Sequence, residues 1–168
     1  MSARKHLLTD VALGVVAGLA GTWVMNRVTT FLYEREDPRA RQREDAARHG
    51  QTAYGIAVEK AAAAVGAGPL PQEQQQKLGQ ALHWALGVGG GALYGALRGR
   101  VPAIDAGQGL AYGTAFWGVV DEGANTALGL TPPPAAFPWQ AHARGLAGHL
   151  AYAVVIDSVL DAADRLRH

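Results

Sequence analysis

Two adjacent carboxylates, Asp121 and Glu122, and two histidines, His142 and His149, lie in stretches that are otherwise apolar. A proline-rich turn separates the acids from the imidazoles along the chain. Ionisable side chains are costly to bury, so each of them needs a partner that neutralises it or forms hydrogen bonds with it. Carboxylates and imidazoles together offer proton transfer, ion binding or metal ligation. Any functional hypothesis therefore starts from this segment.

The composition excludes several classes of protein. The 168 residues contain no cysteine, which rules out disulfides and thiolate metal sites. A net charge of +1 gives no argument for nucleic acid, and no basic stripe interleaved with aromatic residues is present. Charged residues are dense from Glu34 to Lys60 and near both termini, and sparse elsewhere. This pattern favours membrane spans in a single domain, 1–168, over a soluble bundle rich in Ala and Gly, which is the alternative.

Four apolar stretches are long enough to cross a bilayer as helices, namely 7–33, 77–97, 104–128 and 139–160. The first could instead be a secretory signal, but Asp10 within the run and its continuation to Phe31 argue against cleavage. Residues 34–76 are predicted to form one long amphipathic helical connection. Its first part is a solvated, mixed-charge helix, and from Thr52 to Val65 an apolar repeat that includes Tyr54 predicts a weakly amphipathic helix on the membrane surface or on the bundle. We therefore predict an all-α fold, a polytopic membrane four-helix bundle.

Glycines at helical spacing predict where the helices touch. Gly14 and Gly18 form one G-x-x-x-G step, and Gly87, Gly91 and Gly95 repeat every fourth residue. Small residues at this spacing allow close helix contact in membranes. The second stripe is not a phosphate-binding loop, because no strand precedes it and no Lys-Ser or Lys-Thr follows.

Basic residues beside the ends of the predicted spans indicate an orientation. They gather in three short segments, as Arg4 and Lys5, Arg98 and Arg100, and Arg165 and Arg167. Short cytoplasmic segments carry an excess of Lys and Arg. Both termini are therefore predicted to be cytoplasmic, with the 34–76 connection on the outer side.

This orientation predicts a layer of polar side chains in the outer half of the bilayer. At 1.5 Å per helical residue, six side chains from four spans reach similar depth: Asn26, His83, Asp121, Glu122, Asn125 and His149. Asp121 and Asn125 share a helix face, whereas Glu122 should point about 100° away. His142 shares a face with His149 at a spacing of seven residues. Arg27 and Arg144 lie near enough in depth to offset the two acids.

The residues leave four interpretations of this layer open. It could be an interhelical hydrogen-bond clamp or a route for protons or ions. It could bind Zn or Fe through His83, Asp121 and His149, although no compact ligand motif is present. Haem between His83 and His149 would need both ligands at equal depth. Hydrolysis is disfavoured, because no G-x-S-x-G motif exists and both serines lie far away. No cofactor is predicted.

Several motifs resemble a known family. They are AGLAGTWVMNR at 17–27, LHWALGVGGGALYG at 82–95, FWGVVDEGANTALGLTPP at 116–133 and PWQAHARGLAGHLAY at 138–152. With these motifs the chain resembles the YagU-like family of bacterial inner-membrane proteins, which has no assigned activity. The resemblance omits the 34–68 region and includes His83, Asp121, Glu122, His142 and His149. It implies a four-span inner-membrane protein, a loose association with acid tolerance, and no catalytic role.

The sequence thus predicts an inner-membrane protein that handles protons or ions through the acid–imidazole layer and supports acid tolerance. The alternative is a non-catalytic scaffold or assembly subunit whose glycine faces pack on partner helices, and a lipid-acting metalloenzyme is third. The expected partners are the lipid bilayer and either further copies of this chain or another membrane protein, with no nucleic acid.

Overall fold

The structure is a computed structural model that describes residues 2–167, with the side chains of residues 6–167. Within this range the chain is helical and contains no strand, which confirms the predicted all-α class. The elements are α1 (Ser2–Glu34), α2 (Pro38–Arg48), α3 (Ala53–Ala64), α4 (Gln72–Leu97), α5 (Leu110–Trp117), the π-helix η1 (Gly118–Ala124), α6 (Asn125–Ala127), the short 3₁₀ helix η2 (Pro134–Ala136) and α7 (Trp139–Arg167).

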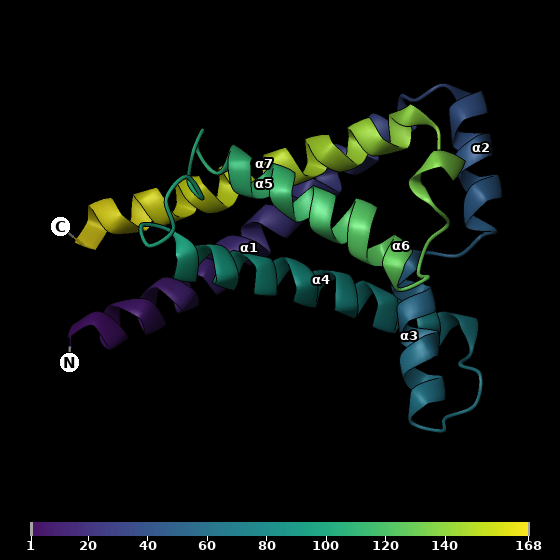
Figure 1. Cartoon of the computed structure of the whole chain (residues 1–168), viewed down its shortest axis with the longest axis horizontal. Coiled ribbons are helices and arrows are strands. Elements are labelled where there is room, and N and C mark those ends of the chain that lie inside the picture. The colour runs from purple at the N-terminus through teal and green to yellow at the C-terminus, as the bar shows by residue number, and fades with distance from the viewer. Residues whose placement is uncertain (1, 168) are drawn as a thin grey trace.

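The long helices pack side by side into one bundle. Helix α1 packs along both α4 and α7, and α5 packs against α7. Helices α5, η1 and α6 follow one another without a break, so they form a single rod. Both termini lie at one end of the bundle, while α2 and α3 lie across the opposite end (Figure 1). The arrangement places the termini and the 34–76 connection at opposite ends of the molecule.

Glycines bring the backbones of α1 and α4 into direct contact, as their spacing predicted. A Cβ atom added to Gly91 would lie 2.5 Å from the Cα atom of Gly18, and one added to Gly18 would lie 2.8 Å from the carbonyl oxygen of Gly87. Added Cβ atoms at Gly14 and Gly95 would also meet the backbone of the opposite helix. These five glycines form the glycine seam, which confirms the predicted packing face.

Tyrosines fill the centre of the bundle. Tyr94, Tyr112 and Tyr152 are buried around Ile156. The hydroxyls of Tyr112 and Tyr152 donate hydrogen bonds to backbone carbonyls of α4, over 2.7 and 2.6 Å. The hydroxyl of Tyr94 donates to Asp157 over 2.6 Å. Each hydroxyl of this tyrosine core therefore has a partner, as buried polar groups require.

A cluster of ion pairs closes the end of the bundle near the termini. Arg98, just after α4, bonds to Asp157 over 3.0 Å, to Asp164 over 2.8 Å and also to Asp161. The three aspartates follow one another along one face of α7, at helical spacing. One guanidinium thus ties the end of α4 to the last turns of α7.

The third predicted span begins later than the sequence indicated. Residues 98–109 form turns, and the rod starts at Leu110 rather than at Ile104. Pro102 removes a backbone donor, and the backbone takes positive φ at Ala103 (67°), Gly107 (65°) and Gly109 (81°). A right-handed helix cannot pass through such a segment, so the prediction of 104–128 is wrong in its first turns.

The 34–76 connection is helical as predicted, and α3 matches the weakly amphipathic helix expected from Thr52 to Val65, but the connection is not continuous. It forms two short helices, α2 and α3, because the left-handed residues His49 (φ 50°) and Gly50 (φ 74°) end the first. The side chain of Thr52 then caps α3 through the amide of Gly55, over 3.1 Å. Helix α2 is not simply solvated either, since Glu44 is only 3% exposed. Ala40 and Glu44 thus pack on the bundle, while Arg39, Arg43 and Asp45 form the exposed, mixed-charge face that was predicted.

Candidate functional site

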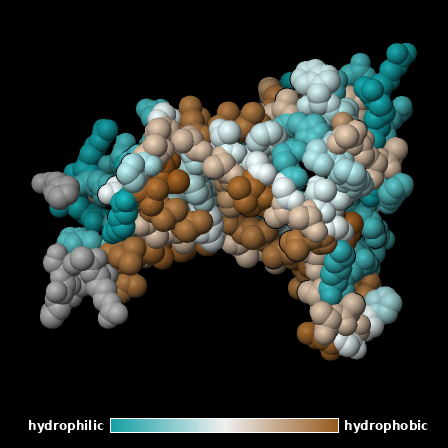
Figure 2. All heavy atoms as spheres, in the orientation of Figure 1, coloured by the Kyte–Doolittle hydropathy of each residue, from teal (hydrophilic) through white to brown (hydrophobic). Residues whose placement is uncertain are grey.

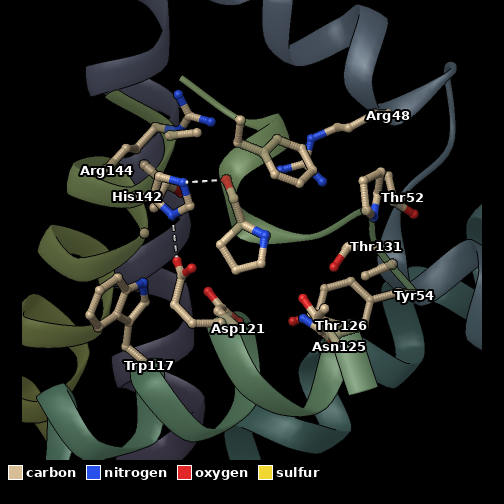
Figure 3. A pocket seen from close by; sticks show the side chains of 18 residues that line it. Arg48, Thr52, Tyr54, Trp117, Asp121, Asn125, Thr126, Thr131, His142 and Arg144 are labelled. Carbon is tan, nitrogen blue, oxygen red and sulfur yellow. Dashed lines mark hydrogen bonds and ion pairs between the residues drawn. The ribbon is translucent and has the colours of Figure 1, made fainter. Parts of the chain in front are cut away.

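A cavity of about 340 Å³ opens at the end of the bundle that carries α2 and α3. Its walls come from α2, α3, η1, the proline-rich turn and the first turns of α7. Figure 3 shows Asp121, Asn125 and Thr126 along one side, with Trp117, His142 and Tyr54 around them. We call this space the outer cavity. Segments far apart in the sequence thus deliver acids, imidazole and aromatic rings to one place.

The π-helical segment presents both carboxylates to the outer cavity. Asp121 and Glu122 lie within η1, where hydrogen bonds span five residues instead of four. A wider turn separates successive side chains by a smaller angle than the α-helix does. Both acids line the outer cavity, but only Asp121 also lines the deeper cavity described below, so their side chains diverge as predicted. Such π-helical turns are rare in proteins overall, and those that occur are often found at functional sites.

Glu122 and His142 are hydrogen-bonded to each other across the cavity wall. The Nδ1 atom of His142 lies 2.7 Å from Oε1 of Glu122, and its Nε2 lies 3.0 Å from the carbonyl oxygen of Pro134. A carbonyl only accepts, so Nε2 must donate its hydrogen to it. One further proton must then lie between Nδ1 and the carboxyl group. The pair is either imidazolium with carboxylate or neutral imidazole with carboxylic acid.

A second, smaller cavity lies deeper in the bundle. It holds about 20 Å³, room for about one water molecule, and is lined by Asp121, His83, His149 and Tyr54, among others. We call it the inner cavity. The Nδ1 atom of His149 donates to the carbonyl of Gly145 over 3.0 Å and lies 3.7 Å from Oδ2 of Asp121. Asp121 lines both cavities and so stands between them.

His83 joins this group from α4. Its Nε2 atom lies 2.8 Å from the amide oxygen of Asn26, which can only accept, so Nε2 carries the hydrogen. The Nδ1 atom is buried and has no hydrogen-bond partner among the described residues. The imidazole also packs against the ring of Tyr54, with centroids 5.0 Å apart. His83 therefore offers a buried, unshared ring nitrogen beside the inner cavity.

The two arginines do not pair with Asp121 or Glu122, contrary to the prediction. Arg144 lines the outer cavity but bonds to Glu36 and Glu44, the latter at 2.6 and 2.7 Å. Arg27 lies over the ring of Trp23, 5.3 Å from its centroid. Acids from α2 and the turn before it satisfy Arg144, which leaves Asp121 without a hydrogen bond among residues 2–167.

The network around Arg144 holds α2 onto the bundle. Arg48 also bonds to Glu44, over 3.0 Å, and stacks on Phe137. Burial alone would raise the pKa of Glu44, but hydrogen bonds and charge from Arg144, and then from Arg48, bring that pKa below its ordinary value. This connection between α2 and α7 fixes one wall of the outer cavity.

Sequence reasoning did not identify several residues of the site. Tyr54, Trp117 and Arg48 line the outer cavity, and none of them was among the candidates. Burial and the negative charge of Asp121 raise the pKa of the Tyr54 hydroxyl. The signal for Tyr54 was its place in the apolar repeat of α3, which left open whether the helix lies on the membrane surface or on the bundle.

The site is not arranged as a metal centre. Within residues 2–167, no group of three or more His, Asp and Glu side chains is placed to hold a metal ion. His83 and His149 each use one ring nitrogen in a hydrogen bond to a protein acceptor. The expected ligand set of His83, Asp121 and His149 is therefore brought together around a cavity but not into coordination geometry.

Fold and site together define a class of protein. The chain is an all-helical bundle in which two helices, His6–Glu34 and Trp139–Arg167, are long and apolar enough to cross a membrane. Its residues 39–158 match the family described as protein of unknown function (DUF1440). Because this match covers most of the chain, the protein belongs to that family. No curated protein and no solved structure matches the chain.

Proposed function

We propose that this protein is a membrane-embedded bundle of four spans. Large apolar side chains face outward along its length: Leu8 is 69% exposed, Val16 57% and Val119 66%. Buried positions instead include polar residues, such as Thr22 at 0% and His149 at 3%. Figure 2 shows apolar surface along the middle of the molecule and hydrophilic surface at its ends. A lipid environment accounts for this distribution, which a water-soluble core does not.

The proposal extends to orientation and location. Helix α1, α4, the α5–α6 rod and α7 would cross the bacterial inner membrane, with both termini in the cytoplasm. The segment with Arg98 and Arg100 lies at the same end as the termini (Figure 1), in agreement with the excess of basic residues expected there. The outer cavity would then face the periplasmic side.

Within this bundle, we infer that the acid–imidazole cluster takes up and releases protons. The observation that carries this proposal is the position of Asp121: it has no hydrogen bond to any residue that the structure describes, lines the open outer cavity and lies 3.7 Å from His149. A carboxyl group in a low-dielectric layer exchanges protons readily with a neighbouring imidazole and water. The buried Nδ1 atom of His83 supplies a further proton acceptor beside the inner cavity.

Access to the cluster is from one side only in this conformation. Beyond the inner cavity lies the tyrosine core, whose hydroxyls bond to backbone carbonyls and to Asp157 rather than to one another. No chain of hydrogen bonds among the described residues therefore links His83 to the far end. The geometry favours proton uptake from the outer face, with support of acid tolerance as its use, over an open proton channel.

The second candidate function, a scaffold that packs on partner helices through glycine, has less support. The glycine seam already forms the contact between α1 and α4 within the chain, so its glycines are not accessible to a partner helix. Gly89, which has open space around its added Cβ, is the glycine of α4 left on the surface within the membrane layer. Gly89 follows the exposed Ala81 and Ala85 at four-residue spacing, so one short stripe of small residues on α4 remains open to a partner helix.

The test is infrared difference spectroscopy on the full chain in lipid nanodiscs as pH is lowered. Asp121→Asn should remove a carbonyl band of protonated carboxyl, and His83→Ala should shift the pH at which that band appears. Glu122→Gln should have a smaller effect, because Glu122 is already bonded to His142. Thermal unfolding of each variant separates these effects from misfolding. An identical titration in wild type and Asp121→Asn would refute proton uptake at Asp121.

A further inference from the structure

The outer cavity has the size and lining of a small-molecule site. Its volume of about 340 Å³ falls in the range of roughly 300–1,000 Å³ typical of ligand pockets. The rings of Trp117, Tyr54 and Phe137 line it together with Asp121 and Thr126. The indole nitrogen of Trp117 is buried and has no partner among the described residues. A proton alone needs neither this volume nor these rings.

The charge that remains available in the cavity is negative. Arg48 and Arg144 also line it, but both are bonded to Glu44, and Arg144 bonds to Glu36 as well. The two guanidinium groups of Arg48 and Arg144 are thus paired with the two carboxylates of Glu36 and Glu44. Asp121 forms no ion pair with either arginine among the described residues; the imidazole of His149 lies 3.7 Å away, and the Asp121 side chain is 31% exposed. An anion would find both arginines occupied, whereas a cation would find a free carboxylate.

Aromatic rings favour an organic cation over a bare metal ion. A cation over the face of Trp, Tyr or Phe is attracted by the ring quadrupole. The cavity already uses this interaction, since the guanidinium of Arg48 lies 5.2 Å from the centroid of Phe137. The lining offers too few converging oxygen ligands at one point for a hard metal ion.

We propose that the outer cavity binds a small organic cation, an ammonium compound, with Asp121 as its counter-ion and Trp117 and Tyr54 as its aromatic walls. This inference goes beyond the proposed proton uptake and does not depend on it, although proton and ammonium would compete for the same carboxylate. The titratable and charged groups around Asp121 are Glu122 on η1, Arg48 on α2, Tyr54 on α3, His83 on α4, and His142, Arg144 and His149 on α7.

The test uses the full chain in nanodiscs and isothermal titration calorimetry with benzyltrimethylammonium, a permanent cation. Benzyl alcohol and benzenesulfonate serve as neutral and anionic probes of similar shape. We expect saturable binding of the cation only. Asp121→Asn should weaken it by about tenfold or more, whereas Asp105→Asn, in a separate polar cavity near the termini, should leave it unchanged.

A second variant keeps the test decisive if Asp121→Asn does not fold. Thr131 lies in the turn that walls the cavity, so Thr131→Trp should fill the space and abolish binding without altering a helix. Equal binding of the neutral probe, or full affinity in both variants, would overturn the proposal.

The pH dependence separates this inference from the proposed function. If both hold, affinity for the permanent cation falls on acidification in the wild type and is independent of pH in Asp121→Asn. Cation binding that does not change with pH would support the ammonium site and refute proton uptake at Asp121. A carboxyl band that titrates and disappears in Asp121→Asn, with no cation binding, would refute the ammonium site alone.

Discussion

Replacing one glycine of the seam tests how closely α1 and α4 must approach. In Gly91→Ala, the new Cβ atom would lie 2.5 Å from the Cα atom and 2.7 Å from the backbone nitrogen of Gly18. These neighbours are backbone atoms of a continuous helix, so they cannot rotate away. The helices must separate by roughly 1 Å, and overpacking of this kind costs about 1–3 kcal/mol.

The same helix supplies a matched control. Gly89 is two residues earlier, and an added Cβ atom there meets nothing within 4 Å. Gly89→Ala should be neutral or stabilising by up to about 1 kcal/mol, because alanine is the better helix former. The assay is reversible unfolding of both variants in mixed micelles by added denaturing detergent. Equal stability of the two variants would refute the seam as the contact that holds α1 against α4.

Three further predictions concern the ends of the bundle. Because the pKa of folded Glu44 is depressed, its contribution to stability should be complete above its ordinary value of 4.5 and be lost as pH falls further; in Glu44→Gln this part of the unfolding profile should be absent, and an unchanged profile would contradict the network with Arg144. Asp157→Asn should cost about 1.5–3 kcal/mol, measured by thermal unfolding, because it weakens the bonds from Arg98 and Tyr94; no loss would show that Arg98 is held by the other aspartates alone. Reporter fusions after Gln51 and at the C-terminus should report opposite sides of the membrane, and identical signals would contradict the proposed topology.

Helical periodicity was sufficient to predict much of this structure. A repeat of four identified the glycine seam, because small residues at that spacing fall on one face whatever the fold around them. The position of each residue along its predicted span also predicted that His83, Asp121 and His149 lie in one layer. The structure places all three around the inner cavity. These inferences depend only on rise and rotation per residue, which are properties of the local chain.

Other features depend on geometry that periodicity does not contain. The different partners of Asp121 and Glu122, His149 and His142, could not be assigned from periodicity, because η1 has wider turns than an α-helix. The partners of Arg144 were missed because Glu36 and Glu44 lie about a hundred residues away in the sequence. A mixed-charge stretch such as α2 is usually solvated, and only the fold shows that its acids meet a buried arginine.

Water should reach the acid–imidazole cluster from one face of the membrane only. The absence of cysteine from the chain makes this directly measurable with single-cysteine variants and a membrane-impermeant thiol reagent. Thr126→Cys lies in the outer cavity, and Thr22→Cys lies at a fully buried position. The reagent is added to vesicles that expose either the side of α2 and α3 or the side of the termini. Thr126→Cys should be labelled only when the side of α2 and α3 is exposed, and Thr22→Cys should be labelled in neither preparation. Reaction of Thr126→Cys from the side of the termini, or from neither side, would contradict the account.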